Sequence, residues 1–310
     1  MRPFLTSPIL LGVLGGKLAR DQVAYINYTD EQLTSRKALE ESFTATGKEN
    51  PRKDFIYYLL HAKDPQTGKG FNKEELDADT GLLISAGADT TGTTLSAAFF
   101  YLLQNPATLQ KLTDEVRTAF AHVEEIRGGA KLNGLLYLRA CIDETLRLAP
   151  PVPTHLPREV LEGGLVVDGE FFPEGTVVGT STYCISHRED YYPRAWEFRP
   201  ERWILVEDGG EGSKESIKIA KDAFCPFSLG TRGCVGRSVA YLELALELAT
   251  CLWLFDIRLA KGRPRAGAQS DLIRDRERRW GRHMKDEFPL VDRFLSGRDG
   301  PEVEFRLRAV

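Results

Sequence analysis

The segment with the strongest chemical character is residues 227–236, which read Phe-Ser-Leu-Gly-Thr-Arg-Gly-Cys-Val-Gly. It places one cysteine, Cys234, in a glycine-rich loop directly ahead of a strongly apolar helical run. A cysteine thiolate can act as a nucleophile or as a ligand to iron. The glycines let the backbone approach a bound group closely, and the amides of such a loop can stabilise the charge on sulfur. The pattern favours an iron–thiolate site, and the alternative is a small buried cysteine at a loop-to-helix turn.

A second unusual segment lies inside a long predicted helix that runs from Asn72 to about Gln104. Residues 86–91 read Ala-Gly-Ala-Asp-Thr-Thr, and a glycine in a helix interior costs about 1 kcal/mol. Such a break in a good helix hints at function. Gly87 could open space against a flat cofactor, Asp89 could relay protons from solvent, and the Thr90 hydroxyl could open a local bulge for water or dioxygen. The alternative is a small-residue helix crossing.

A third pattern pairs Glu144 with Arg147, three residues apart in a predicted helix over residues 135–148. This spacing places both charges on one helix face, where such pairs are common. Further along, residues 198–203 read Phe-Arg-Pro-Glu-Arg-Trp. Taken alone, the pair predicts only a helix with an ion pair on it.

Together these motifs resemble those of the cytochrome P450 family. The residues in and around them are most similar to those of its fungal secondary-metabolism members. The haem-binding signature of that family is Phe-x-x-Gly-x-Arg-x-Cys-x-Gly. The matching residues are Phe227, Gly230, Arg232, Cys234 and Gly236. Residues 86–91 match the family's oxygen-activation segment, which the resemblance places over the haem face opposite the cysteine.

The resemblance implies a haem-thiolate monooxygenase that inserts one oxygen atom from O₂ into an apolar small molecule, a secondary-metabolite intermediate. Its cofactor would be haem b, with Cys234 as the axial ligand of the iron. Electrons would come from NADPH through NADPH–cytochrome P450 reductase. Asp89 and Thr90 would deliver protons, and Gly87 would admit oxygen.

The resemblance also assigns residues that hold the cofactor and the substrate. Glu144, Arg147 and Arg202 would form a triad that serves folding and cofactor retention. A second group would contact the haem propionates or line the substrate pocket: Arg158 and Arg232 for the propionates, and Val152, His155 and Leu156 for the pocket.

The expected fold is mainly α with small β-sheets, as in the C-terminal portion of the cytochrome P450 fold. We expect an atypical helical segment over residues 1–50 and the haem-binding portion over residues 51–310. Because family members have a longer N-terminal region, the chain reads as N-terminally truncated. Two alternatives follow: a non-catalytic haem-binding remnant, or an O₂-independent isomerase or dehydratase that acts on a peroxide. The Asp89-Thr90 pair argues against the isomerase or dehydratase, because that chemistry needs no proton relay.

Local patterns complete the prediction. Strands are expected over residues 164–167, 171–172, 176–183 and 303–307. Residues 207–222 are charged and glycine-rich, which predicts a solvated loop.

Composition limits the remaining possibilities. The 310 residues carry a net charge of -4, whereas nucleic-acid-binding domains usually present a basic face, so we expect no nucleic-acid partner. The five cysteines show no paired spacing, which argues against a zinc site or disulfide framework and for a reducing compartment.

The apolar run over residues 8–16 is shorter than the about 20 residues of a membrane span, so no anchor is expected. Full-length relatives would lie on the cytoplasmic side, associated with the endoplasmic reticulum.

Overall fold

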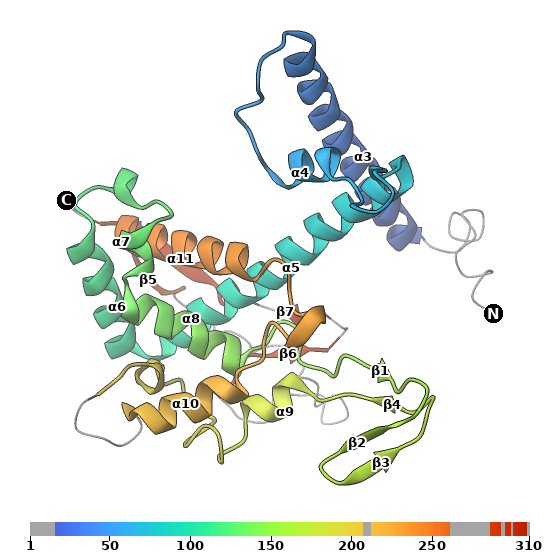
Figure 1. Cartoon of the computed structure of the whole chain (residues 1–310). Coiled ribbons are helices and arrows are strands. Elements are labelled where there is room, and N and C mark those ends of the chain that lie inside the picture. Colours follow the sequence, from blue (N-terminus) through green and yellow to red (C-terminus); the bar gives the residue numbers. More distant parts are fainter. Residues whose placement is uncertain (1–15, 207–211, 261–285, 293–294, 299, 309–310) are drawn as a thin grey trace. The chain divides into compact units, whose positions relative to one another are not determined.

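The computed structural model describes residues 16–206, 212–260, 286–292, 295–298 and 300–308 (Figure 1). Contacts between residues divide the chain into two compact units, residues 1–88 and 89–310.

The first unit contains α3 (Gly16–Ala45), α4 (Phe55–His61) and the opening of α5 (Lys73–Gln104). Asp54 caps α4, since its Oδ1 accepts a hydrogen bond from the backbone N–H of Tyr57 at 3.0 Å. The same carboxylate pairs with Arg36 of α3, with 2.9 Å between Arg36 Nε and Asp54 Oδ2. Burial raises the pKa of Asp54, but the hydrogen bonds from Arg36 and from the Tyr57 N–H, together with the charges of Arg36 and Arg52, outweigh burial and hold that pKa below its usual value. One ionised side chain thus fixes α4 against α3.

The second unit is built around four helices. They are the C-terminal half of α5, α6 (Pro106–Ala119), α8 (Leu136–Leu148) and α11 (Arg237–Leu254). The apolar face of each helix contributes to one core, because their apolar residues recur at helical spacing. Its fully buried members include Ala97, Leu112, Leu138, Leu244 and Leu248.

Helix α6 orients the two helices that carry the candidate site. The Glu115 carboxylate accepts the backbone N–H groups of Tyr137 at 2.9 Å and Leu138 at 2.8 Å, which satisfies the first amides of α8. Arg117 donates to the carbonyl of Leu252 at the end of α11 at 3.0 Å. One helix therefore sets the position of the start of α8 and the end of α11.

Shorter elements connect these helices. The helical ones are η1 (Val123–Glu125), α7 (Ala130–Asn133), α9 (Thr182–Ser186), η2 (Pro200–Trp203), α10 (Lys214–Ala223) and η4 (Gly230–Arg232). Within the described residues the strands pair antiparallel, two by two: β1 (Arg158–Glu159) with β4 (Val177–Val178), β2 (Leu165–Val167) with β3 (Glu170–Phe172), β5 (Phe255–Leu259) with β8 (Val303–Leu307), and β6 (Leu290–Val291) with β7 (Gly297–Arg298).

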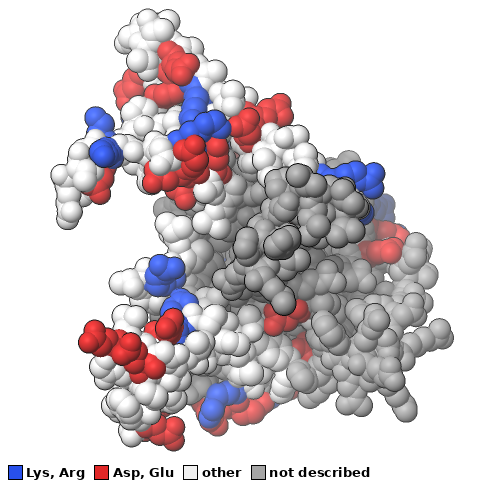
Figure 2. Space-filling model, turned by 90° about the vertical axis from the view of Figure 1, so that its right-hand side faces the viewer, with Lys and Arg blue, Asp and Glu red and all other residues white. Residues whose placement is uncertain are grey.

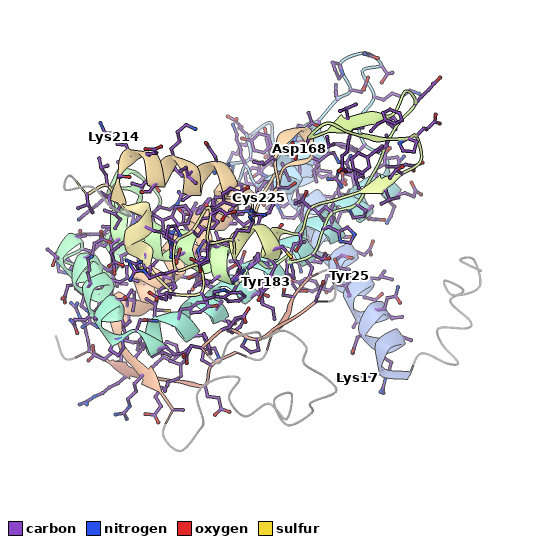
Figure 3. The ribbon with its side chains drawn as sticks, turned by 90° about the horizontal axis from the view of Figure 1, so that it is seen from below. Lys17, Tyr25, Asp168, Tyr183, Lys214 and Cys225 are labelled. Atoms are coloured by element: carbon purple, nitrogen blue, oxygen red, sulfur yellow. The ribbon has the colours of Figure 1, made fainter. Side chains whose placement is uncertain are left out.

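The β2–β3 hairpin shows how local sequence sets the turn. Asp168, labelled in Figure 3, has φ 50° and Gly169 has φ 86°. Two consecutive positive φ values are the geometry of a type I′ turn, which Asp-Gly favours and which matches the twist of the two strands. The register pairs Leu165 with Phe172.

The structure confirms the mainly α fold with small sheets and corrects two local predictions. The predicted strand over residues 176–183 is wrong beyond Val178, because Ser181 caps a short helix by accepting the N–H of Cys184 at 3.3 Å. The predicted loop over residues 207–222 is wrong from Lys214 onward, where α10 begins (Figure 3). Ser213 caps that helix, and its buried Ala220 gives it an apolar side.

One face of the first unit carries charged side chains of both signs (Figure 2). On the face in Figure 2, acidic and basic side chains of the first unit lie interspersed, with no separate basic area. None of the helices within the described residues combines the length and the apolar character needed to cross a membrane.

Candidate functional site

The loop around Cys234 lies between α10 and α11 and closes on itself through backbone hydrogen bonds. The N–H of Cys234 donates to the carbonyl of Phe227 at 2.8 Å, and the N–H of Gly233 donates to the carbonyl of Gly230 at 3.0 Å. The chain reverses within this short distance because Ser228 has φ 59° and Gly230 has φ 73°. The left-handed conformation is easy for glycine and uncommon for serine. The predicted glycine-rich cysteine loop is therefore an ordered structure held by its own backbone.

The Cys234 thiol is free and exposed, and two apolar side chains of the same loop are exposed as well. Leu229 is 69% exposed and Val235 is 89% exposed, although both lie on this ordered loop. A Cβ added at Gly236 would lie 3.8 Å from the Cys234 Sγ, so the glycine keeps that side of the sulfur clear. A soft thiolate beside uncovered apolar side chains fits a flat, largely apolar group that carries iron.

The three residues that the resemblance groups as a triad, Glu144, Arg147 and Arg202, contact one another and are all buried. Arg147 donates to Glu144 twice, from Nε to Oε2 at 3.0 Å and from Nη2 to Oε1 at 2.8 Å. Arg202 Nε donates to Glu144 Oε1 at 3.0 Å. Helix α8 supplies the first pair and η2 supplies Arg202, so the triad ties these elements together.

The remaining donors of Arg147 reach backbone carbonyls across the connection between α8 and η2. Its Nη1 donates to Ser186 and to Ala195, each at 2.7 Å, and its Nη2 donates to Glu197 at 3.2 Å. A guanidinium group has five N–H donors, and all five are used. The buried charge is therefore fully hydrogen-bonded, which is the condition under which burial of a charge is tolerated.

Sequence reasoning missed two further donors to Glu144. The backbone N–H of Arg199 donates to Oε1 at 2.9 Å, and Trp203 Nε1 donates to Oε2 at 2.9 Å. The signal was present, since Trp203 directly follows Arg202 and tryptophan carries an N–H that phenylalanine lacks. Residues 199–203 thus contribute three donors to one carboxylate.

The segment of α5 that carries the predicted proton-delivery residues is continuous α-helix, so the predicted bulge at Thr90 is not formed. The Thr94 hydroxyl donates to the Thr90 carbonyl at 3.0 Å, four residues back, a bond that a regular helix accommodates. Asp89 is exposed and Thr90 is partly buried. Thr91 Oγ1 donates to Glu243 Oε2 at 3.3 Å, which links this part of α5 to α11, the helix that follows Cys234.

Gly87 belongs to the first unit. It is an exposed helical residue, and an added Cβ would meet nothing within 4 Å. The glycine is therefore not required by packing within that unit.

The predicted propionate partners lie on exposed backbone segments. Arg158 of β1 is exposed, and its Nη1 donates to the carbonyl of Pro157 at 2.9 Å, so its guanidinium folds back on its own segment. Arg232 is exposed in η4, two residues before Cys234. Arg232 therefore lies on the cysteine loop, whereas Arg158 lies on a separate segment.

The predicted pocket residues lie together on the segment that precedes β1. Val152 and Leu156 are half-buried, and His155 is exposed. His155 forms an isolated bridge with Ser181, and a Cβ at Gly179 would lie 3.0 Å from the imidazole Cδ2. The imidazole ring is therefore packed against backbone that only glycine leaves open.

Comparisons with known proteins extend these observations. The cytochrome P450 family model matches residues 1–272, so the match includes the first fifty residues. The chain is 40% identical over 256 residues to the cytochrome P450 monooxygenase AKT7 of Alternaria alternata, covering 82% of this chain and 48% of that protein. It is 41% identical over 263 residues to a cytochrome P450 monooxygenase of Gibberella zeae, covering 85% of this chain and 58% of that protein.

A crystal structure of a cytochrome P450 superposes with a TM-score of 0.70 at 21% identity, covering 96% of this chain and 60% of the other. This likeness shows the fold. The chain spans about half the length of the curated relatives that it matches.

Proposed function

Because the chain belongs to the cytochrome P450 family, we propose that it forms the haem-binding part of a haem-thiolate monooxygenase with Cys234 as the iron ligand. The observation that carries the proposal is the exposed thiol of Cys234 in an ordered loop, next to exposed apolar side chains and a glycine that leaves the sulfur uncovered. The proposed reaction inserts one oxygen atom from O₂ into an apolar small molecule, an intermediate of fungal secondary metabolism.

The residues of this chain would hold haem b and manage protons. Cys234 would bind the iron, Arg232 and Arg158 would meet the propionates, and the buried triad would hold the two segments that flank the site. When bound, haem b supplies the oxygen chemistry, and the cysteine ligand donates electron density to the iron. The Asp89 carboxylate would take up protons from solvent and the Thr90 hydroxyl would pass them on.

The substrate and the electron donor follow from the same proposal. Val152, His155 and Leu156 would line one side of the substrate pocket, with two apolar side chains and one imidazole for a polar group. Electrons from NADPH would arrive through a cytochrome P450 reductase. In full-length relatives we propose a location at the cytoplasmic side of the endoplasmic reticulum.

The test is the absorption spectrum of the purified chain after incubation with haem, reduction and addition of CO. We expect a red-shifted Soret band typical of a thiolate ligand, lost in Cys234→Ala and retained in Cys184→Ala. Cys184 is the matched control, because it is also an exposed free cysteine but lies in α9, outside the loop. Absence of bound haem, or a thiolate band that survives Cys234→Ala, would refute the proposal.

Activity is tested separately. With a reductase and NADPH, the monooxygenase places one atom of ¹⁸O₂ in the product, and Thr90→Ala lowers coupling of electron transfer to product. Product that forms from a peroxide without ¹⁸O₂ incorporation would identify the isomerase or dehydratase alternative. Bound haem with no turnover would identify a non-catalytic remnant.

A further inference from the structure

A second carboxylate, the half-buried Asp143, lies next to Glu144 on α8 and faces different partners. Glu144 belongs to the triad and accepts from Arg202, whereas Asp143 contacts α11. Tyr241 of α11 donates its hydroxyl to Asp143 Oδ1 at 2.7 Å, and Arg139 Nε donates to Oδ2 at 2.9 Å. The Arg139 guanidinium lies 3.6 Å from the centre of the Tyr241 ring. Asp143, Arg139 and Tyr241 form a compact cluster, here called the α8–α11 clamp.

The clamp reaches the cysteine loop through an aromatic contact. The Tyr241 ring lies 5.1 Å from the ring of Phe227, the first residue of the loop. Arg237 at the start of α11 lies 5.8 Å from the Phe227 ring and 6.0 Å from the Tyr241 ring. The backbone carbonyl of Phe227 accepts the N–H of Cys234. A continuous set of contacts therefore connects Asp143 to the backbone of Cys234.

The carboxylate end of the cluster is largely covered, whereas the Arg139 side chain is 48% exposed. The Asp143 side chain is 14% exposed. Burial raises the pKa of Asp143, while Arg139 and Tyr241 oppose that rise, and burial also raises the pKa of the Tyr241 hydroxyl. Hydrogen bonds in such a low-dielectric setting hold their geometry more tightly than exposed ones do.

We propose that Asp143 and Tyr241 are positioning residues for Cys234: they hold the Phe227 ring in place, and Phe227 in turn fixes the backbone of the cysteine loop. The importance of this loop rests on the proposed function, but its ordering by the clamp is a property of the chain without haem. The competing explanation is that the clamp only packs α8 on α11.

The chain offers a matched control on the same helix. Tyr137 also donates its hydroxyl to a carboxylate, Glu201 Oε1, at 2.7 Å, and a cation also lies on its ring, with Lys111 Nζ 4.0 Å from the centre. This second Tyr–carboxylate pair ties α8 to η2. Tyr137→Phe therefore removes the same kind of bond as Tyr241→Phe, and Glu201→Gln matches Asp143→Asn.

The experiment is hydrogen–deuterium exchange of the full chain, read by mass spectrometry on the peptide that covers residues 227–236. Tyr241→Phe and Asp143→Asn are expected to speed its exchange about tenfold over the wild type, because loss of one strong hydrogen bond lowers the free energy of local opening. Tyr137→Phe and Glu201→Gln are expected to leave it unchanged, and the peptide of α6 serves as an internal reference. Equal loop exchange in all four variants would overturn the inference.

A spectroscopic readout separates positioning from packing in the haem-loaded chain. In the reduced, CO-treated chain, we expect some haem to show the red-shifted Soret band of a thiolate ligand and some to show the band of a neutral thiol ligand. The two clamp variants are expected to raise the share of the neutral-thiol band about threefold relative to Tyr137→Phe. An unchanged share overturns the claim that the clamp acts on Cys234. If the wild-type chain takes up no haem, the proposed function fails, and the exchange experiment still decides the role of the clamp.

Discussion

Replacing Glu144 by glutamine is the sharpest test of how the buried triad stabilises this fold. The substitution keeps the shape of the side chain and removes its charge. Glu144 accepts five hydrogen bonds, three at Oε1 and two at Oε2. A glutamine keeps one oxygen and presents an NH₂ group at the other position, and that group cannot accept from these donors. At best, the two bonds at Oε2 are lost.

The size of the effect follows from this count. Each lost hydrogen bond to a charged group is worth about 1.5–3 kcal/mol, and removal of one partner of a buried ion pair costs about 3–5 kcal/mol. We expect a loss of about 3–5 kcal/mol in the free energy of unfolding, against a typical total of about 5–15 kcal/mol. For a unit of this size the melting temperature would fall by roughly 6–20 °C.

The assay is urea and thermal unfolding of the chain, followed by circular dichroism, with Glu197→Gln as the control. Glu197 is 57% exposed and lies 3.7 Å from Arg194 and 3.9 Å from Arg199, so its loss is expected to cost less than about 1 kcal/mol. The reasoning is refuted if Glu144→Gln and Glu197→Gln lie within about 1 kcal/mol of each other.

Three further predictions use other contacts. Trp203→Phe keeps an aromatic ring but removes one donor to Glu144, so it is expected to lower the free energy of urea unfolding by about 1.5–3 kcal/mol; a change below about 0.5 kcal/mol would contradict this. Glu115→Ala leaves two amides of α8 without their acceptor and is expected to cost about 1–2 kcal/mol in the same assay, and an unchanged urea midpoint would be the opposing result. In native protein near pH 7.5, iodoacetamide is expected to modify Cys234 before Cys141, because burial raises the pKa of Cys141 and lowers its thiolate population; equal rates by mass spectrometry would count against the described burial.

The sequence predicts the parts of the site that depend on residue type and spacing. The cysteine loop is recognisable because it requires particular side chains at fixed intervals, whereas the triad of Glu144, Arg147 and Arg202 was expected only from the resemblance to the family. The structure adds where those side chains are held. The contact between Tyr241 and Asp143 joins residues 98 positions apart, a separation at which local periodicity carries no information.

Errors in the sequence-based prediction arise where two local preferences compete. The glycines and charges near residue 210 suggested that a loop continues to residue 222, but the Ser213 cap and the buried Ala220 start a helix at Lys214. At Thr90 a threonine was expected to distort its helix. The helix stays α-helical through this segment, and the Thr94 hydroxyl, four residues on, donates to the Thr90 carbonyl.

The long reach of the buried triad also bears on synthesis of the chain. The partners of Arg147 and Glu144 outside α8 lie 39 to 59 residues later in the sequence. At about 5–20 residues per second, the ribosome adds 59 residues in about 3–12 s. During this interval the nascent α8 carries a charged pair whose burial would be unfavourable, so α8 cannot complete its docking. We therefore expect α8 to complete its docking only after the segment through Trp203 has left the exit tunnel, and the four-helix core to close later still, once α11 has followed.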